Sequence, residues 1–177
     1  MVSPATLLTP AELRARAARI TVVLTDCDGV LTDGGVYYGP GGEALLRFNR
    51  RDGLGVERLR QAGLASAIVT REASPLVELR AAKLEVRLFS GVKDKLHLLP
   101  VILDELEATA DGVAYIGDDL NDLPLLQEVA KHGLTAAPAD AAAPLKPAVH
   151  LVTQALGGQG AFREFSEWIL SLKGASV

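Results

Sequence analysis

Cysteine is scarce in this chain, and Cys27 is the only one among its 177 residues. A single cysteine excludes a disulfide within the chain. The first residues also lack the basic stretch followed by a long apolar run that a secretory signal peptide needs. These two absences together predict a reducing, cytoplasmic setting.

Long apolar runs and an excess of positive charge are missing as well. No apolar run approaches the roughly 18 to 20 residues needed to cross a bilayer. The formal net charge is −4, which provides no basic surface for nucleic acid. We therefore expect neither a membrane nor a nucleic-acid partner, and a small molecule as the ligand. A negative protein can still bind an anion where a few cations and a metal gather in one cleft.

Apolar residues, in contrast, are abundant at 49% of the chain, with 23% charged. This composition and length predict a single globular domain over residues 1–177. Thr9 followed by Pro10 predicts the capped start of a short helix that continues to about Ala18.

Short apolar, β-branched runs then alternate with helical stretches. The first, residues 20–24, is apolar on both faces, as in a parallel strand covered by two helix layers. The other predicted strands are 65–69, 86–89, 113–116 and 134–137, with a further apolar run at 149–152, and the predicted helices are 55–61, 76–83, 95–107 and 123–130. This alternation predicts a doubly wound, Rossmann-like α/β fold with a parallel sheet, whose ligands bind beyond the carboxyl ends of the strands.

One segment interrupts the alternation. Residues 35–38 and 43–48 flank the run Gly39-Pro40-Gly41-Gly42, which is typical of a turn. We therefore predict a β-hairpin inserted after strand one, at about residues 35–48. Neither a repeat nor a second domain is predicted.

Two carboxylates follow the first predicted strand directly. Asp26 and Asp28 are two residues apart, so an extended backbone would place both on the same side. Like charges this close are favourable only with a cation, and Mg²⁺ prefers hard oxygen ligands. The alternative is an Asx-turn, because Asp-x-Asp-Gly is also common turn chemistry.

A second acidic run, Gly117-Asp118-Asp119-Leu120-Asn121-Asp122, follows the predicted strand 113–116. Asp119 or Asn121 could cap the helix that begins near Asp122. Capping requires only one such residue, however, and three further acids remain. Their place at a strand end favours a ligand site.

Two candidate phosphate donors lie between the acidic runs. Thr70 ends the strand 65–69, and Lys95 begins a helix. Either residue alone is ordinary, since a lysine is more often a solvated helix residue than a ligand. Their order between the two acidic runs gives them weight.

These four features occur in the order of the four motifs of the haloacid dehalogenase (HAD) superfamily, and the chain resembles that superfamily over most of its length. Three further runs narrow the resemblance to capless sugar-acid phosphatases, which act on 3-deoxy-D-manno-octulosonate (KDO) 8-phosphate or on nonulosonate 9-phosphates and have no cap domain. The runs are residues 28–34 (Asp-Gly-Val-Leu-Thr-Asp-Gly), 48–53 (Phe-Asn-Arg-Arg-Asp-Gly) and 157–164 (Gly-Gly-Gln-Gly-Ala-Phe-Arg-Glu).

The resemblance implies Mg²⁺-dependent hydrolysis through an aspartyl-phosphate. Asp26 would attack phosphorus, and Asp28 would protonate the leaving oxygen and later deprotonate water. The implied contacts are Asp26, the Asp28 backbone carbonyl and Asp118 for the metal, Asp122 for a water on the metal, and Thr70 and Lys95 for the phosphoryl oxygens.

The substrate signals disagree. Arg51-Asp52-Gly53 looks like the octulosonate type, whereas Glu72, with Lys83 further along its helix, looks more like the nonulosonate (KDN or N-acetylneuraminate) type. Arg71 or Arg51 would bind the sugar carboxylate. We expect KDO 8-phosphate as the substrate and keep a nonulosonate 9-phosphate as the alternative.

The resemblance also implies a homotetramer, in which the inserted hairpins form a central barrel and Tyr37, Tyr38 and Phe48 lie at the interface. These aromatics could instead pack on their own domain.

Two rival functions remain: another HAD reaction, such as phosphomutase or broad phosphomonoester hydrolysis, and a non-catalytic oligomerisation module of a sugar-acid activating pathway. Intact Asp26, Asp28, Lys95 and Asp118 disfavour the module.

Overall fold

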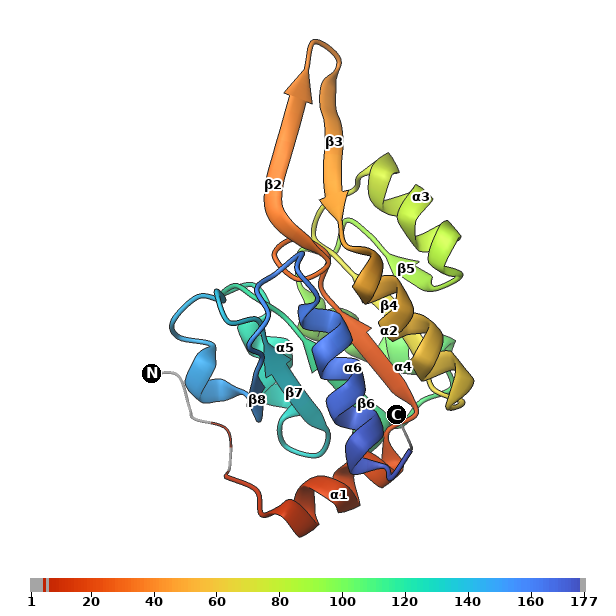
Figure 1. Ribbon diagram of the computed structural model, residues 1–177, viewed down its shortest axis with the longest axis vertical. Helices are drawn as coiled ribbons and strands as arrows, with labels where there is room; N and C mark the ends of the chain where they lie inside the picture. The colour runs from red at the N-terminus through yellow and green to blue at the C-terminus, as the bar shows by residue number, and fades with distance from the viewer. Residues whose placement is uncertain (1–4, 6, 176–177) are drawn as a thin grey trace.

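A six-stranded parallel sheet forms the centre of the protein (Figure 1). The computed structural model describes residue 5 and residues 7–175. The strands of this sheet are β1 (Val22–Thr25), β4 (Ala65–Val69), β5 (Arg87–Phe89), β6 (Val113–Ile116), β7 (Leu134–Ala137) and β8 (Leu151–Val152). Their order is β5-β4-β1-β6-β7-β8, and every pairing is parallel. The predicted α/β class is thereby confirmed.

Helices cover both faces of the sheet. They are α1 (Pro10–Arg19), α2 (Arg50–Gln61), α3 (Pro75–Leu84), α4 (Lys95–Glu105), α5 (Leu123–Val129) and α6 (Ala161–Leu172), with short 3-10 turns at Ala110–Gly112 and Lys146–Ala148. Helices α1, α2, α3 and α6 share one apolar core with the sheet, and α4 and α5 share the other. The chain is therefore a three-layer sandwich.

Strand β1 explains why its sequence is apolar on both faces. Val23 contributes to the core under α2 and α6, whereas Val22 and Leu24 contribute to the core under α4 and α5. Successive side chains of a strand point to opposite faces, so a strand between two helix layers needs an apolar residue at every position. Burial of these side chains holds the end of β1 in a fixed place.

Local capping sets several helix boundaries. The predicted cap at Thr9 is confirmed, since its side chain accepts a hydrogen bond from the Glu12 amide and the Thr9 amide donates one to the Glu12 carboxylate. Helix α2 begins five residues before the prediction because Asn49 caps it through the Arg51 amide. Helix α4 ends at Glu105, two residues before the predicted end.

Helix α6 was not among the predicted elements. Its sequence is amphipathic, and Phe162, Phe165 and Ile169 are fully buried against the sheet.

Strand β1 begins two residues later than predicted, because the Ile20 amide still bonds to the Ala17 carbonyl at the end of α1.

The predicted hairpin is present and is longer than expected. Strands β2 (Thr32–Gly39) and β3 (Gly42–Phe48) pair antiparallel as a separate two-stranded sheet. Figure 1 shows the hairpin standing away from the three layers. Tyr37 and Tyr38 are 63% and 77% exposed near its tip. Phe48, at the base, instead packs against its own chain, with the Arg80 guanidinium 5.3 Å over its ring.

Within the described part of the chain, no helix combines the length and apolarity that a membrane span requires.

Candidate active site

The neighbouring strands β1 and β6 bring the two acidic runs together. Thr25 pairs with Ile116 at their carboxyl ends, and the Asp26 amide donates to the Ile116 carbonyl at 3.0 Å. Asp26 therefore leaves the sheet beside the start of the second acidic run. Parallel strands place their carboxyl ends at the same edge, so this convergence follows from the strand order.

Asp26 is nearly buried and is held from two sides. Its Oδ1 atom accepts a hydrogen bond from the Cys27 amide at 2.7 Å and lies 2.7 Å from Lys95 Nζ. Burial and the neighbouring Asp122 carboxylate raise the pKa of Asp26 well above its ordinary value, while Lys95 opposes the rise. The ion pair with Lys95 therefore favours the ionised form that a nucleophile needs.

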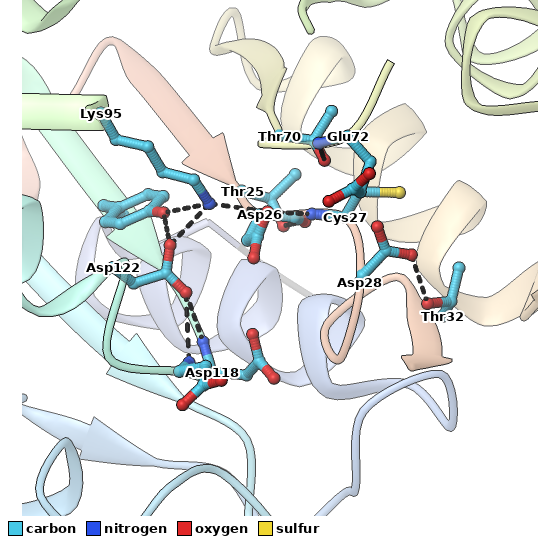
Figure 2. A network of polar contacts seen from close by, with 12 residues as sticks. Thr25, Asp26, Cys27, Asp28, Thr32, Thr70, Glu72, Lys95, Asp118 and Asp122 are labelled. Carbon is cyan, nitrogen blue, oxygen red and sulfur yellow. Dashed lines mark hydrogen bonds and ion pairs between the residues drawn. The ribbon is translucent and has the colours of Figure 1, made fainter. Parts of the chain in front are cut away.

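Lys95 connects Asp26 to a second buried carboxylate (Figure 2). Its Nζ atom lies 2.6 Å from Asp122 Oδ1, and the Tyr115 hydroxyl donates to the same oxygen. Burial alone would lower the pKa of Lys95, but Asp26 and Asp122 raise it above its ordinary value. Lys95 is therefore a fixed positive charge behind Asp26.

Asp122 also organises the backbone of the second acidic run. Its Oδ2 atom accepts hydrogen bonds from the amides of Asp118 and Asp119, at 2.9 and 3.2 Å. Neither Asp119 nor Asn121 caps α5. Asp122 itself occupies the N-cap position and makes no capping bond. The capping interpretation is therefore wrong, because the Asp122 side chain turns back toward the strand end.

Three carboxylates gather closely enough to hold a cation. Oxygen atoms of Asp26, Asp118 and Asp122 lie within 4.8 Å of one another. Burial, with Asp122 and Asp119 beside it, also raises the pKa of Asp118. One lysine cannot neutralise three such groups, and a divalent ion with oxygen ligands would relieve their repulsion. The donor set therefore fits Mg²⁺.

Asp28 reaches the same cleft by a turn, and the extended backbone expected between Asp26 and Asp28 is wrong. The Cys27 carbonyl accepts from the amides of residues 30, 31 and 32, which reverses the chain. Gly29 permits the turn because its φ is +81°, in the left-handed region that glycine adopts freely. A Cβ atom there would lie 1.9 Å from Asp118 Oδ2, so the glycine also leaves room for Asp118. The glycine of Asp-x-Asp-Gly thus serves both the turn and the approach of Asp118.

The Asp28 carboxyl group points away from the three-carboxylate cluster. Its Oδ1 atom accepts a hydrogen bond from the Thr32 hydroxyl at 3.1 Å (Figure 2). Burial raises the pKa of Asp28, and the Thr32 bond opposes that rise. The group therefore retains a proton more readily than an exposed aspartate, as a proton donor requires.

A cleft of about 210 Å³ lies over these groups at the carboxyl ends of the strands. Its lining residues are Asp26, Asp28, Gly29, Gly34, Thr70, Arg71, Glu72, Asp118, Asp119 and Asn121. Lys95 and Asp122 lie beneath this surface. Arg51 is not part of the lining, and its side chain runs beside Gly160 instead. The structure thus gathers all but one of the predicted site residues.

Sequence reasoning missed Tyr115 and Thr32. Tyr115 is fully buried, and its hydroxyl is the only polar side-chain group of β6. That lone polar group was an available signal, because a buried tyrosine hydroxyl usually has a partner. Thr32 gives no comparable signal, since only the turn brings it to Asp28.

Comparison with known proteins identifies the family. No protein-family model matches the chain. The 3-deoxy-D-manno-octulosonate 8-phosphate phosphatase KdsC of Yersinia pestis is 43% identical over 156 residues, which is 88% of this chain and 82% of that protein. KdsC of Escherichia coli K12 is 39% identical over 165 residues, covering 93% and 86%. The chain belongs to the KdsC family.

Solved KdsC structures share the fold as well. The crystal structure of the Yersinia pestis phosphatase superposes with a TM-score of 0.86 at 41% identity, covering 93% of this chain and 88% of that one. The Moraxella catarrhalis phosphatase, solved with magnesium, phosphate and KDO, gives a TM-score of 0.85 at 33% identity and covers 92% of each chain. A HAD hydrolase of Legionella pneumophila gives 0.86 at 34% identity, covering 93% and 89%. The HAD resemblance drawn from the motifs is thereby confirmed.

Proposed function

We propose that this protein is a magnesium-dependent phosphatase that hydrolyses KDO 8-phosphate through an aspartyl-phosphate. The observation that carries the proposal is the position of Asp26. It lies at the end of β1, against Lys95, and opens on a cleft that Asp28, Thr70 and Asp118 also line. A nucleophile, a proton donor and phosphate-binding groups thus face one small volume.

The relatives support octulosonate as the sugar. The KdsC proteins that are 39–43% identical over most of the chain are named as KDO 8-phosphate phosphatases. The Moraxella catarrhalis structure contains bound KDO. The Glu72 signal for a nonulosonate has no such support. We therefore propose KDO 8-phosphate and retain the nonulosonate 9-phosphate as the comparison substrate in the test.

In the first step, Asp26 would attack phosphorus while the bond to the sugar oxygen breaks. Both side-chain contacts of Asp26 described above engage Oδ1, which leaves Oδ2 as the attacking atom. Asp28 would give its proton to the departing sugar oxygen, so that a neutral hydroxyl leaves. Lys95 and Thr70 would stabilise charge on the phosphoryl oxygens.

In the second step, Asp28 would take a proton from a water molecule as that water attacks the phosphorus. The bond to Asp26 then breaks and inorganic phosphate is released. The same carboxyl group therefore acts first as an acid and then as a base. Its hydrogen bond from Thr32 holds it at the cleft through both steps.

Asp26, Asp118 and the backbone carbonyl of Asp28 would hold Mg²⁺, and Asp122 would contact it through water. The bound ion would neutralise phosphoryl charge. Asp122 already uses both oxygens, for Lys95 and Tyr115 on one side and for two amides on the other. This occupation supports an indirect role for Asp122.

The proposal extends to the assembly and the compartment. An open cleft on a capless chain needs a neighbouring subunit to enclose the substrate, and we propose the homotetramer implied by the family resemblance. Tyr37 and Tyr38 project from the hairpin without a cover from their own chain, which supports an interface there. A cytoplasmic setting remains a proposal based on the single, buried Cys27.

The decisive test is phosphate release by the purified protein. KDO 8-phosphate and N-acetylneuraminate 9-phosphate are assayed side by side with Mg²⁺ and again with excess chelator. We expect metal-dependent turnover with the larger kcat/KM for KDO 8-phosphate, and no turnover by a folded Asp26→Asn variant. Full activity of that variant would overturn the assignment of the nucleophile. No turnover on either sugar phosphate or on an aryl phosphate would support the oligomerisation module.

A further inference from the structure

Two of the sequence runs singled out above, residues 48–53 and 157–164, have no part in the proposed chemistry. In the structure they meet each other at the base of the hairpin. Figure 1 shows the loop that precedes α6 passing this base. The contacts of this loop suggest a role for both runs in the active site.

Gly157 is pressed against the turn that carries Asp28. A Cβ atom on Gly157 would lie 2.0 Å from the Gly29 carbonyl oxygen, a separation that real Cβ atoms do not show. From the other side, Asp140 Oδ1 accepts a hydrogen bond from the Gly157 amide at 2.9 Å. The backbone of Gly157 is therefore fixed between Asp140 and the residue after Asp28.

Gly158 ties the same loop to the turn and to the hairpin. Its amide donates to the Val30 carbonyl at 2.9 Å. Its carbonyl accepts from Asn49 Nδ2 at 3.2 Å and from an Arg47 guanidinium nitrogen at 3.3 Å. Arg47 also pairs with Asp33 at the base of the hairpin. Gly158 thus joins the loop before α6 to the turn at residues 28–31 and to the base of the hairpin.

Asn49 and Asp52 anchor this arrangement from α2. Asn49 caps α2 with its Oδ1 atom while its Nδ2 atom reaches Gly158. Asp52, one turn later and fully buried, accepts from the Arg163 amide at 3.0 Å in the first turn of α6. The start of α6, and with it the loop before α6, is therefore fixed relative to α2.

From this geometry we propose that Gly157 and Asn49 are positioning residues for Asp28. The inference rests on the proposed phosphatase function and adds that the loop 157–158 holds the turn at residues 28–31 in place. Gly157 acts through its close approach to Gly29, and Asn49 acts by holding the Gly158 carbonyl. A misplacement of about 1 Å in a catalytic group can cost on the order of 100-fold in rate.

The test uses the dependence on the leaving group, because Asp28 donates a proton only in the first step. A sugar alkoxide is a poor leaving group and needs that proton, whereas p-nitrophenolate leaves without it. For a substrate that forms a covalent intermediate, kcat/KM reports the first step. We expect Gly157→Ala to lower kcat/KM for KDO 8-phosphate by about 100-fold and that for p-nitrophenyl phosphate by less than about 10-fold.

Asn49→Asp is a second, milder variant that keeps the helix cap. Its carboxylate can still accept from the Arg51 amide, but it has no hydrogen to give to Gly158 and repels that carbonyl. We expect the same selective loss, about 10-fold on the sugar phosphate and 2- to 3-fold on the aryl phosphate. It also keeps the inference testable if Gly157→Ala does not fold.

Gln61→Glu is the matched control for Asn49→Asp, because it makes the same change on an exposed side chain at the far end of α2. It should leave the ratio of the two kcat/KM values unchanged. Equal losses on both substrates in folded Gly157→Ala and Asn49→Asp, or no loss at all, would overturn the positioning role. Absence of turnover by the unsubstituted protein would instead overturn the proposed function, and this inference with it.

Discussion

The Nζ atom of Lys95 lies 2.6 Å from Asp122 Oδ1, and at most 1% of either side chain is exposed to solvent. The same ammonium group is 2.7 Å from Asp26. A buried lysine between two buried carboxylates is favourable only while all partners are present, since each charge alone would be strongly desolvated. The pair therefore links the stability of the fold to the chemistry of the cleft.

Replacing Lys95 by methionine should destabilise the protein and abolish turnover. Two buried carboxylates lose their counter-charge, which costs about 3–5 kcal/mol. Urea unfolding at pH 7 with chelator present measures this loss. Lys131→Met is the matched control, because Lys131 makes an exposed pair with Glu128 worth about 0.5 kcal/mol or less. Equal losses in the two variants would contradict a stabilising buried network.

Magnesium alone should raise the thermal midpoint. An ion that binds only the folded state stabilises it by about 2.7 kcal/mol at 100 times its Kd. Asp118→Asn removes one of the three clustered carboxylates and should abolish most of the shift. Asp119→Asn, at the cleft but outside the cluster, should keep it. Differential scanning calorimetry with and without Mg²⁺ decides between them, and an undiminished shift in Asp118→Asn would refute that ligand.

His150 should make the fold less stable in acid. Its Nδ1 atom accepts from the Thr135 amide at 3.1 Å, and burial, with Arg16 nearby, lowers the pKa of His150 from 6.5 to about 4. The unfolded chain therefore binds this proton first, so stability is full above about pH 6.5 and falls as the pH drops toward 4. After allowance for partial exposure, the loss is on the order of 1–2 kcal/mol.

Urea unfolding between pH 7.5 and 4.5 measures the effect of His150. The variant His150→Asn keeps an acceptor for Thr135 but cannot take up a proton, so its stability should vary less with pH. His97→Asn, which changes an exposed residue of α4, serves as the control and should retain the full slope. A slope that survives in His150→Asn would assign the pH dependence to other groups.

Arg71→Gln should weaken recognition of the sugar acid more than the chemical step. Arg71 lines the cleft, and an arginine–carboxylate pair is geometrically specific. We expect KM for KDO 8-phosphate to rise about 10-fold, with a much smaller rise for p-nitrophenyl phosphate, which has no carboxylate. Arg14→Gln on α1 is the control. Equal effects on the two substrates would argue against carboxylate binding by Arg71.

Tyr38→Arg should disrupt the proposed tetramer. The side chain is 77% exposed near the hairpin tip, and a buried arginine at an interface lacks a partner there. Light scattering should report a tetramer for the unsubstituted protein and smaller species for the variant. Leu79→Arg places the same charge on an exposed site of α3 and should leave the assembly intact. A monomeric unsubstituted protein would refute the proposal directly.

Strand ends were the most predictable part of the site. Each predicted strand ends within one residue of the observed end, because apolar runs in a buried parallel sheet stop where the chain meets solvent. Asp26, Thr70 and Asp118 follow such ends, so their convergence could be inferred from order alone. Lys95 was also assigned to the site, although its burial beneath Asp26 was not foreseen.

The positions of other site residues depend on long-range contacts, which local sequence patterns do not reveal. The hydroxyl of Thr32 meets Asp28 only because the Cys27 carbonyl gathers three amides and reverses the chain. The place of Arg51 beside Gly160 rather than at the cleft depends on the packing of α2 against α6. Such long-range packing overrides local patterns.

The meeting of Gly157 with Gly29 also has a consequence for synthesis on the ribosome. Strand β1 emerges before its partner β6, whose paired residues lie 91 positions further along the chain (Val22 pairs with Val113), and the loop at Gly157 emerges later still. Pairings of such long range cannot form until both partners have left the exit tunnel. We therefore expect nascent chains that stop short of the loop to carry an unfinished cleft, so that catalytic competence arises only after the loop at Gly157 has emerged.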